Sequence, residues 1–566
     1  ELGKASLVVP VKALQRQYEE DYCSGEKKIV GRDGRPLKIS MITGRENHDS
    51  VIQPGVSCAD PRLPDTVKLI EKNVALLKEF YEDNPLIQAK HDVVDWKRLK
   101  RMSVAPANPY WSPIVGSEVE LKQLTDSTPK KYRGLNGREF IFYHRKKGCS
   151  YFDQYQAYFD ADVLVFNAAK YLIEVALDRK PATRIDIIDE ADAFLDNFAT
   201  EQSLDLTRLA GALRNVVSES PEVRQLVDEA LEMIRLDEQR VRTLGLVHAG
   251  TIVPFGETLL RKVFAVLGHQ EVEADILVDE QSYGNHALEV VKSFAGALDQ
   301  TFVRYRVEGE VDGEKNLVAE LVTTHVAEQF ALLASKVDAL VLMSGTLHSK
   351  EVLEGVYGIK DYAVVQAEVE QPGTMEIVRT GKEFDCKWRE LKDRRQEYVD
   401  ALRACVIAAD RPTLVQVHAY EDLPSAAEKD ALGVLEVMHR EALRDQQGAD
   451  KTGRLVSLFK SGMNDLLFST KCNRGVDFPG DQCRSVIFTK YPNPNVRGVF
   501  WQVLEKTHPD QYWSLYKDKA HREFVQRLSR ALRKKDDFVR VLSPDLRVLT
   551  AVQELQRKGL AGGSGR

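Results

Sequence analysis

The sequence has 566 residues, and its contents of 43% hydrophobic and 29% charged residues are ordinary for a globular protein. This length excludes a single hydrophobic core and predicts about three or four domains. Lys and Arg number 79 against 86 Asp and Glu, so the net charge of −7 gives no overall basic signature, and a nucleic-acid site would need a local basic groove. There is no apolar run long enough to span a membrane and no secretory signal, and the odd number of cysteines, seven, argues against a disulfide framework. We therefore expect an intracellular protein, cytoplasmic or in a nucleoid or nucleus, that does not enter a membrane.

The first part of the chain combines strand patterns with a long loop-rich stretch. Residues 5–10 have the pattern of a short buried strand, and residues 12–22 have helical spacing. Residues 31–148 are rich in loops and contain one clear helical pattern, at 65–83. A strand followed by a helix is expected over 161–177. This order predicts an α/β domain that carries an insertion.

The rest of the chain continues this domain and then begins another. Residues 200–307 have mostly the pattern of amphipathic helices, and the helix predicted over 220–244 starts with a Ser-Pro cap. A strand that ends in small polar residues is expected over 337–347. After about residue 372 a second α/β pattern begins, with a helix at 396–409. Its strand patterns lie at 413–420, 465–472, 485–492 and 538–544.

The stretch ATRIDIIDEADAFLD, residues 182–196, ends an apolar strand pattern with Asp189 and Glu190. Parallel strands of open α/β sheets present their functional groups at the carboxyl end, where ligands bind. Two adjacent carboxylates there suit the binding of Mg²⁺ through water and the orientation of a water that attacks a phosphate. The alternative is a buried strand that ends in an ordinary polar turn.

A second set of charged residues lies near the end of the chain, in HREFVQRLSRALRKKDD. Gln526, Arg530 and Arg533 are spaced by four and three residues, which places them along one face of a predicted helix. Two guanidinium groups on one face can clamp a γ-phosphate. The alternative is a solvated basic face, because other basic residues lie nearby: Arg527, Lys534 and Lys535.

Two polar loops follow predicted strands. The stretch TKCNRGVDFPGDQCR places Gly475, Asp477 and Gly480 in a turn that is flanked by Arg474 and Arg484. Glycine allows close backbone approach to phosphate or sugar, and an aspartate there can bind a ribose hydroxyl or hold the arginines. The stretch MSGTLHS supplies hydroxyls that can couple the nucleotide state to a neighbouring domain: Ser344, Thr346 and Ser349. The alternative for each loop is an ordinary capped turn.

In their order along the chain these stretches resemble the motifs of the XPD/DinG branch of superfamily 2 helicases. Asp189-Glu190-Ala191-Asp192 resembles motif II, and Ser344-Gly345-Thr346-Leu347 resembles motif III. RGVDFPGDQCR resembles motif V, QRLSRALRKKDD motif VI, VVPVKALQRQYEEDY motif Ia and LVQVHAYEDL, more weakly, motif IV. The likeness covers nearly the whole chain, and motifs V and VI are its most specific parts.

The resemblance implies an α/β fold with two RecA-like parallel-sheet domains. Domain 1 would comprise residues 1–30, 151–199 and 325–370, and domain 2 would comprise residues 371–566. An iron–sulfur-type module at 31–150 and a helical arch at 200–324 would be inserted into domain 1. The implied function is that of a monomeric helicase that binds ATP and Mg²⁺ between the two domains, moves 5′ to 3′ on single-stranded DNA and unwinds forked DNA.

The resemblance also implies roles for individual residues. Asp189 would coordinate Mg²⁺, Glu190 would position the attacking water, and Gln526 would link the arginines Arg530 and Arg533 to the cleft. The residues expected to contact the nucleotide are Gly475, Asp477, Ser344 and Thr346. The residues expected to contact DNA are Lys12, Gln15, Arg45, Asn47 and Arg474. Val11 stands where the family has a polar residue, so one expected phosphate contact is missing.

The stretch PKKYRGLNGREFIFYHRKKG, residues 129–148, interleaves basic and aromatic residues. This composition is typical of a single-strand path, in which bases stack and phosphates are neutralised. A basic surface hairpin is the alternative. We expect His144 within it to be a surface or packing residue and not a metal ligand.

The chain departs from the family in its phosphate-binding loop. The only partial match to Gly-Lys-Ser/Thr is Gly3-Lys4-Ala5-Ser6, which precedes a strand instead of opening a helix. The family places motif I just before motif Ia, so we expect it upstream of Glu1, and a degenerate motor is the alternative. Without its lysine and hydroxyl, residues 1–566 should hydrolyse ATP poorly or not at all.

The module also departs from the family, which usually has four cysteines for a [4Fe–4S] cluster there. Only Cys58 and Cys149 are credible ligands, with Ser50 and Asn108 at positions where cysteines would be plausible. His48, Ser50 or Asp65 would be unusual substitutes, and Cys23 lies before the module. We expect a module that lacks the cluster and is held by packing. Cys58 and Cys149 are then either a remnant of the cluster site or buried structural cysteines.

Two other functions stay open. A truncated or retired helicase scaffold could act as a single-stranded nucleic-acid binding protein, although Glu190, Arg530 and Arg533 together argue for a working motor. A nuclease on a DinG-like frame is disfavoured, because no carboxylates outside residues 189–192 cluster as a two-metal site would require.

Overall fold

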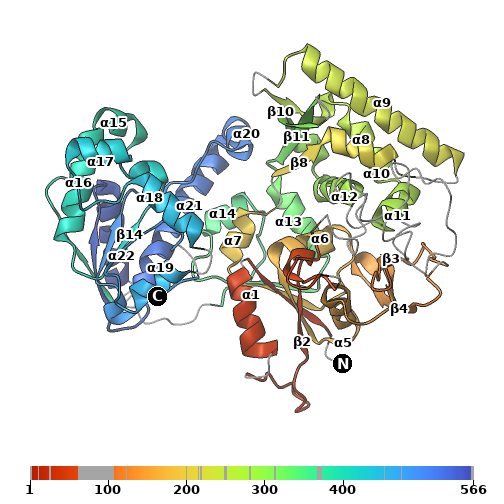
Figure 1. Cartoon of the computed structure of the whole chain (residues 1–566), viewed down its shortest axis with the longest axis horizontal. Helices are drawn as coiled ribbons and strands as arrows, with labels where there is room; N and C mark the ends of the chain where they lie inside the picture. The colour runs from red at the N-terminus through yellow and green to blue at the C-terminus, as the bar shows by residue number, and fades with distance from the viewer. Residues whose placement is uncertain are drawn as a thin grey trace. The chain divides into compact units, whose positions relative to one another are not determined.

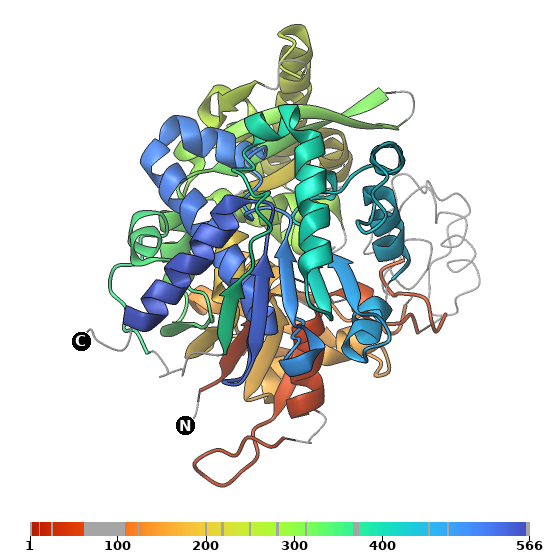
Figure 2. The same cartoon turned by 90° about the vertical axis from the view of Figure 1, so that its left-hand side faces the viewer.

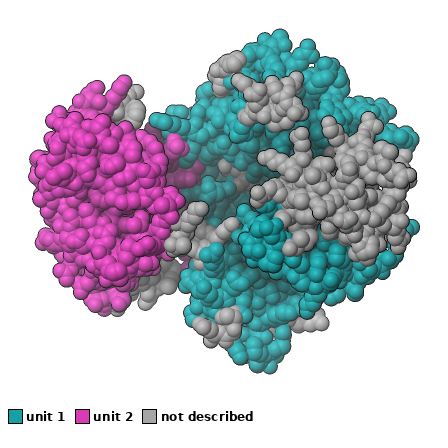
Figure 3. Space-filling model, in the orientation of Figure 1, with its two compact units in different colours: residues 1–347, 353–360, 496–511 teal, residues 348–352, 361–495, 512–566 magenta. Residues whose placement is uncertain are grey.

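The computed structural model divides the chain into two compact units (Figure 3). Unit 1 comprises residues 1–347, 353–360 and 496–511, and unit 2 comprises residues 348–352, 361–495 and 512–566. The structure describes residues 3–10, 12–23, 27–51, 53–60, 108–122, 124–198, 201–214, 216, 220–247, 251–278, 282–311, 314–365, 373–450, 453–472 and 475–561. Among these residues, no helix has both the length and the apolar character that crossing a membrane requires.

Unit 1 contains a five-stranded parallel sheet with the strand order β12-β7-β1-β6-β2. The strands are β1 (Ala5–Val9), β2 (Ile39–Ile42), β6 (Val163–Asn167), β7 (Ile185–Ile188) and β12 (Ala339–Leu342). Strand β7 lies between β1 and β12, which explains why its residues are mostly apolar. The helices around this sheet are α1 (Lys12–Tyr18), α6 (Ala168–Ala176), α7 (Ala191–Asp196), α13 (Val326–Ser335) and α14 (Lys350–Gly355) (Figure 1). The predicted parallel α/β domain is therefore confirmed, with the Asp189-Glu190 strand in its interior.

The loop-rich stretch contains a small antiparallel sheet in the order β3-β5-β4. Its strands are β3 (Ile114–Gly116), β4 (Thr128–Arg133) and β5 (Glu139–His144), followed by α4 (Ser150–Asp153) and α5 (Ala157–Asp160). The turn between β4 and β5 contains Asn136 and Gly137 with φ of 55° and 75°, a conformation that these two residue types tolerate best. Strands β4 and β5 thus form the predicted basic hairpin. The helix expected at 65–83 lies outside the described residues.

Residues 200–324 were expected to form a helical arch of mostly amphipathic helices, and beside such helices they contain a four-stranded antiparallel sheet in the order β8-β11-β10-β9. The strands are β8 (Glu201–Asp205), β9 (Ile252–Pro254), β10 (Thr301–Val311) and β11 (Glu314–Thr323). The alternation of buried Val303 and Tyr305 with more exposed Arg304 and Arg306 is the period-two signal that was overlooked. The helices are α8 (Leu206–Arg214), α9 (Pro221–Thr243), α10 (Leu260–Leu267), α11 (Gln270–Val278) and α12 (Tyr283–Phe294). Helix α9 begins with the expected cap, in which Ser220 Oγ accepts from Val223 N at 3.4 Å.

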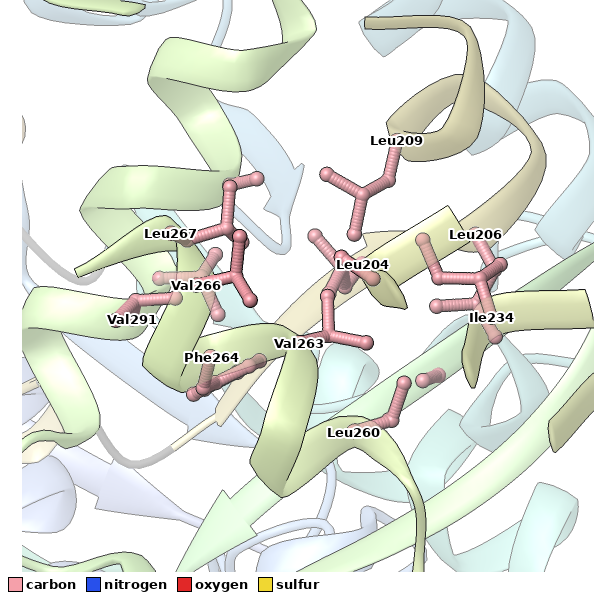
Figure 4. Packing of buried hydrophobic residues seen from close by; sticks show 14 of the residues in the cluster. Leu204, Leu206, Leu209, Ile234, Leu260, Val263, Phe264, Val266, Leu267 and Val291 are labelled. Atoms are coloured by element: carbon pink, nitrogen blue, oxygen red, sulfur yellow. The ribbon is translucent and has the colours of Figure 1, made fainter. Parts of the chain in front are cut away.

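One apolar core joins these helices to the sheet. Leu204 on β8, Phe264 on α10 and Val291 on α12 belong to this cluster and are buried (Figure 4). Each of these elements packs its apolar face into the same core, as a layered domain with a core of its own requires.

Unit 2 contains a second five-stranded parallel sheet, in the order β13-β17-β16-β14-β15 (Figure 2). Its strands are β13 (Thr374–Ile377), β14 (Thr413–Gln416), β15 (Leu466–Ser469), β16 (Ser485–Phe488) and β17 (Phe538–Leu542). The helices are α15 (Trp388–Asp393), α16 (Arg395–Ala408), α17 (Ala426–Leu432), α18 (Arg440–Ala449), α19 (Arg454–Lys460), α21 (Pro509–Leu528) and α22 (Leu546–Ala561). The four strand patterns predicted after residue 372 are all confirmed. With two parallel-sheet domains, the predicted fold class is confirmed.

Helix α20 (Val499–Thr507) lies in unit 1, although the chain before and after residues 496–511 lies in unit 2. Its Val499 and Val503 are buried with Val322 of β11 in one apolar cluster. Hydrophobic burial against the sheet of residues 200–324 therefore holds this segment in unit 1.

Candidate functional site

The carboxylate of Asp189 lies at the end of β7 and is fixed by two hydrogen bonds. Its Oδ1 accepts from Glu190 N at 2.9 Å, and its Oδ2 accepts from the Tyr18 hydroxyl at 3.1 Å. Asp189 N donates to Val8 O at 2.9 Å, so the backbone continues the ladder with β1. Burial and the neighbouring Asp189 carboxylate raise the pKa of Tyr18, which keeps its hydroxyl protonated as the donor. Motif Ia thereby positions the first acid of motif II.

Glu190 has a left-handed backbone conformation, with φ of 48° and ψ of 47°. This conformation costs a residue with a Cβ about 1 kcal/mol, and such strain concentrates at functional turns. The turn ends β7 and starts α7, where Ala191 N donates to Met343 O at 2.8 Å. The two half-exposed carboxylates of Asp189 and Glu190 are oxygen donors of the type that Mg²⁺ prefers.

Asp192 links motif II to motif III. Its side chain is fully buried, and Ser344 Oγ donates to its Oδ1 at 2.7 Å. Thr346 Oγ1 donates to the other carboxylate oxygen at 3.4 Å, and Thr346 N donates to Ser344 Oγ at 3.0 Å. The two hydroxyls expected to sense the nucleotide thus lie beside the acids and satisfy a buried carboxylate. Sequence reasoning assigned Asp192 no role beyond its place in the tetrapeptide.

A buried polar cluster supports β7 from within the sheet. Lys180 and Asp186 are both fully buried, and Lys180 Nζ lies 3.2 Å from Asp186 Oδ1. The Tyr171 hydroxyl donates to the other oxygen of Asp186 at 2.6 Å. Burial lowers the pKa of Lys180, and Asp186 opposes this effect. An aspartate in the middle of an apolar strand was the signal in the sequence that could have revealed the cluster.

In unit 2, one carboxylate oxygen holds both arginines of motif VI. Asp477 Oδ1 accepts from Arg530 Nη1 at 2.9 Å and from Arg533 Nη2 at 2.6 Å. Phe478 N donates to Arg530 O at 2.7 Å, so the loop of motif V is also tied to motif VI through its backbone. Of the two roles considered for Asp477, contact with the arginines is the one present in the structure.

The expectation that Gln526, Arg530 and Arg533 share one helical face was wrong. Helix α21 ends at Leu528, a short 3₁₀ turn covers Ser529–Ala531, and Arg533 lies beyond it. The Asp537 carboxylate stops the helix, since its Oδ2 accepts from the backbone N–H groups of residues 533 and 534 at 2.5 and 2.7 Å. The arginines converge through the loop of motif V and not through helical spacing.

The basic stretch around motif VI is less solvated than its composition indicates. Gln526 is buried, and Arg527 is buried with its Nε 2.8 Å from Glu523 Oε1. Arg530 is 7% exposed, whereas Arg533 and Lys534 are exposed. The alternative of a uniformly solvated basic face therefore does not describe this segment.

Two glycines of motif V have left-handed backbone conformations, which glycine adopts without steric strain. Gly475 and Gly480 have φ of 71° and 62°. Gly480 N donates to Asp537 Oδ1 at 2.8 Å, and Arg484 pairs with Asp481 at 2.9 Å. Arg474 lies outside the described residues.

Two residues expected to contact DNA lie at α1. The helix begins at Lys12, and the side chain of Gln15 is buried. In the module, Asn47 is exposed and its Nδ2 donates to Gly44 O at 3.1 Å. Arg45 is half-buried, with its guanidinium 4.1 Å from the centroid of the Tyr151 ring. Of Gln15, Arg45 and Asn47, Asn47 is therefore the most accessible.

The basic hairpin exposes charged residues of β4 and buries aromatic residues of β5. Lys131 and Arg133 of β4 are exposed, whereas Phe140, Phe142 and Tyr143 of β5 are buried. These buried rings of β5 are closed to stacking with bases, whereas the exposed Lys131 and Arg133 offer phosphate contacts. His144 Nε2 lies 2.9 Å from Asp153 Oδ1, in agreement with the packing role expected for it.

The donors of the module do not fit a four-iron cluster. Residues 31–150 contain two cysteines, Cys58 and Cys149, and both are buried. The ring nitrogens of His48 contact Thr43 Oγ1 at 2.7 Å and Ser150 Oγ at 2.9 Å. In the part of the chain that the structure describes, no three His, Cys, Asp or Glu residues gather as metal ligands. Asp65 lies outside that part.

Comparisons with known proteins find similarity to helicases. Residues 406–560 match the family described as Helicase C-terminal domain. The ATP-dependent DNA helicase DinG of Photobacterium profundum is 30% identical over 95 residues, a match that covers 16% of this chain and 14% of that protein. A solved XPD helicase is similar over 98% of this chain and 95% of its own, with 16% identity and a TM-score of 0.48. The S. tokodaii Xpd4 structure is similar over 70% of this chain and 81% of its own, with 16% identity and a TM-score of 0.41.

The matched region contains β14 to β17 and α21, together with Asp477 and the two arginines that it holds. The C-terminal part of the chain is thus a helicase C-terminal domain. Both sequence matches agree with the resemblance of the motifs to XPD/DinG-like superfamily 2 helicases, over the parts of the chain that they cover.

Proposed function

We propose that the protein is an ATP-dependent DNA helicase that moves 5′ to 3′ on single-stranded DNA and unwinds forked duplexes. The observation that carries the proposal is the contact of Arg530 and Arg533 with Asp477 inside the matched helicase domain. Two guanidinium groups fixed side by side stabilise charge on a transferring phosphoryl group.

The acids of unit 1 have the complementary task. Asp189, held by Tyr18 and the backbone of Glu190, would bind Mg²⁺ through water. Glu190 would accept the proton of the attacking water. Its left-handed backbone conformation gives its side chain a direction different from that of Asp189. Ser344 and Thr346 bind Asp192, which is separated from the two acids only by Ala191 in the chain. A movement of Asp189 and Glu190 would therefore also move these two hydroxyls.

The DNA strand would contact exposed polar and basic groups of residues 31–150. Asn47, Lys131 and Arg133 supply hydrogen-bond donors suited to phosphate oxygens. We assign further backbone contacts to Lys12 and Arg474. Binding through phosphates predicts an affinity that falls with salt and depends little on base sequence.

The test is ATP hydrolysis with and without single-stranded DNA, by residues 1–566 and in parallel by a longer natural form of the chain where one exists. We expect DNA-stimulated turnover that is lost in Glu190→Gln and in Arg530→Ala. Matched controls are Glu222→Gln on the exposed face of α9 and Lys534→Ala, which removes an exposed charge beside Arg533. Both controls should retain turnover. Turnover by residues 1–566 alone should be weak, because their sequence has no Gly-Lys-Ser/Thr loop that opens a helix.

A different outcome would favour the second candidate function. Salt-sensitive binding of single-stranded DNA without turnover in the natural protein would contradict a helicase. It would favour a retired scaffold that binds single strands. Turnover that survives in Glu190→Gln would contradict the assignment of the acids.

A further inference from the structure

We propose that the module of residues 31–60 and 108–150 is a metal-independent domain, organised by an arginine–aromatic cluster of Arg45, Tyr151 and Phe152 in place of an iron–sulfur cluster. The proposal does not depend on the helicase activity. It concerns what holds the module in shape and which chemical conditions the module tolerates.

The thiols of the module act as structural groups. A four-iron cluster takes four thiolate ligands, and residues 31–150 supply two thiols. Cys58 is 2% exposed, and its Sγ donates to Arg45 O at 3.4 Å, a contact that requires the protonated thiol. Burial raises the pKa of the Cys149 thiol, so this sulfur is also neutral.

The polar residues that could replace the missing ligands bind to their own loops. Ser50 is buried, and its Oγ accepts from Gln53 N at 3.1 Å. Asn108 is buried, and its Oδ1 accepts from Tyr110 N at 2.9 Å. Each side chain satisfies a backbone donor nearby, as expected of a turn cap and not of a ligand set.

Arg45 occupies the centre of this region. Its guanidinium lies 4.1 Å from the centroid of the Tyr151 ring and 5.0 Å from that of Phe152. Both rings are buried, and a partly desolvated cation over aromatic faces is attracted by their negative electrostatic potential. His48 contacts the edge of Tyr151, with ring centroids 5.5 Å apart, and binds Ser150. The loop before Cys58 is thereby fixed to α4 without a metal.

The same cluster continues to the sheet of unit 1. The hydroxyls of Tyr151 and Tyr155 lie 3.0 Å apart, and Lys170 Nζ donates to Tyr155 at 3.0 Å. Lys170 belongs to α6 and pairs with the buried Glu174 at 2.8 Å. These hydrogen bonds join the module to the domain that carries Asp189. The thiols of Cys58 and Cys149 are buried and protonated, and a protonated thiol is a poor nucleophile, so we expect them to react slowly with thiol reagents and oxidants.

The test compares metal content with the effects of two variants. We expect protein purified without oxygen to contain no stoichiometric iron or acid-labile sulfide and to show no charge-transfer absorbance in the visible range. The double variant Cys58→Ser with Cys149→Ser should retain the protease resistance of the module. Arg45→Ala should lose this resistance, and the exposed Arg133→Ala should not.

Arg45→Lys keeps the charge but loses the planar contact with the rings. This variant replaces Arg45→Ala in the protease test if Arg45→Ala fails to fold. The proposal predicts that its module is digested faster than that of the parent while unit 2 stays resistant. Stoichiometric iron that disappears in the double cysteine variant would overturn the proposal. Equal resistance of Arg45→Lys and the parent would overturn the role of Arg45. Neither result would bear on ATP turnover, so the proposed function is tested separately.

Discussion

Asp477 holds Arg530 through a single carboxylate oxygen, which accepts from Arg530 Nη1 at 2.9 Å and also accepts from Arg533. Arg530 is almost fully buried, whereas Arg533 is exposed. A buried guanidinium needs a partner, and the shared carboxylate keeps two like charges close together. Asp477 therefore sets the spacing of the two arginines before any phosphate is present.

Replacement of Asp477 should test this spacing. Asp477→Asn removes the charge that compensates both arginines, and we expect ATP turnover to fall about 10²-fold because the guanidiniums move apart. The control is Asp481→Asn in the same loop, which breaks only the exposed pair with Arg484. Turnover is measured together with the melting temperature. Parent-like turnover in Asp477→Asn would show that the arginines are positioned by other groups.

The contact of Ser344 with Asp192 predicts a combined effect on stability and activity. Ser344→Ala removes the 2.7 Å hydrogen bond to the buried Asp192 carboxylate and should lower the free energy of unfolding by about 1–3 kcal/mol. Stimulation of turnover by DNA should decrease more than turnover without DNA. Denaturant unfolding and steady-state assays measure the two effects. Ser344→Thr keeps the hydroxyl and should recover both, and failure to recover would contradict the assigned contact.

The left-handed conformation of Glu190 predicts a variant that is more stable and inactive. Glycine adopts this conformation without strain, so Glu190→Gly should raise the free energy of unfolding by about 0.5–1 kcal/mol while turnover is lost. Glu190→Gln retains the Cβ, so its stability should stay within about 0.5 kcal/mol of the parent. Thermal unfolding distinguishes the two variants. A less stable Glu190→Gly would mean that the backbone there is not strained.

The buried Glu174 predicts a dependence of stability on pH. Burial opposes its ionisation, but Arg179 and Lys170 prevail and lower its pKa from 4.5 to about 2. The stabilisation is therefore fully present above pH 4.5 and is lost as the pH falls through about 2. Glu174→Gln should destabilise the protein by about 3 kcal/mol at neutral pH, because two buried cations lose their partner.

The measurement is the difference in unfolding free energy between the parent and Glu174→Gln across this range. The difference should shrink as the pH falls from 4.5 towards 2. Glu222→Gln on the exposed face of α9 is the control and should differ little from the parent at every pH. A difference that stays constant with pH would exclude an ionised Glu174 as its source.

Much of the fold follows from local patterns. The apolar strand that ends in Asp189 and the helix that starts at Ser220 were both predictable, because burial on both faces and end-capping leave clear signatures. Ser344 was also placed correctly, since the carboxyl ends of neighbouring parallel strands meet at one edge of the sheet. These predictions needed only short-range sequence and the rules of parallel sheets.

The remaining features depend on contacts between distant residues. Asp537 ends α21 by binding backbone groups of residues 533 and 534, and no spacing rule indicates that a helix stops there. Arg45 was predicted to contact DNA, and its contact with the Tyr151 ring was not foreseen, because Tyr151 lies more than a hundred residues away along the chain. Long-range partners of this kind decide which charged residues reach solvent, and one sequence does not disclose them.

The membership of α20 in unit 1 bears on how the protein can be divided. Val499, Val503 and Leu504 are buried, and the first two pack with Val322 of β11. Expression of the C-terminal helicase domain by itself would leave this apolar stripe in water in the middle of its chain. We expect such a fragment to aggregate unless the stripe is made polar, whereas the two units should be recovered together from a single chain.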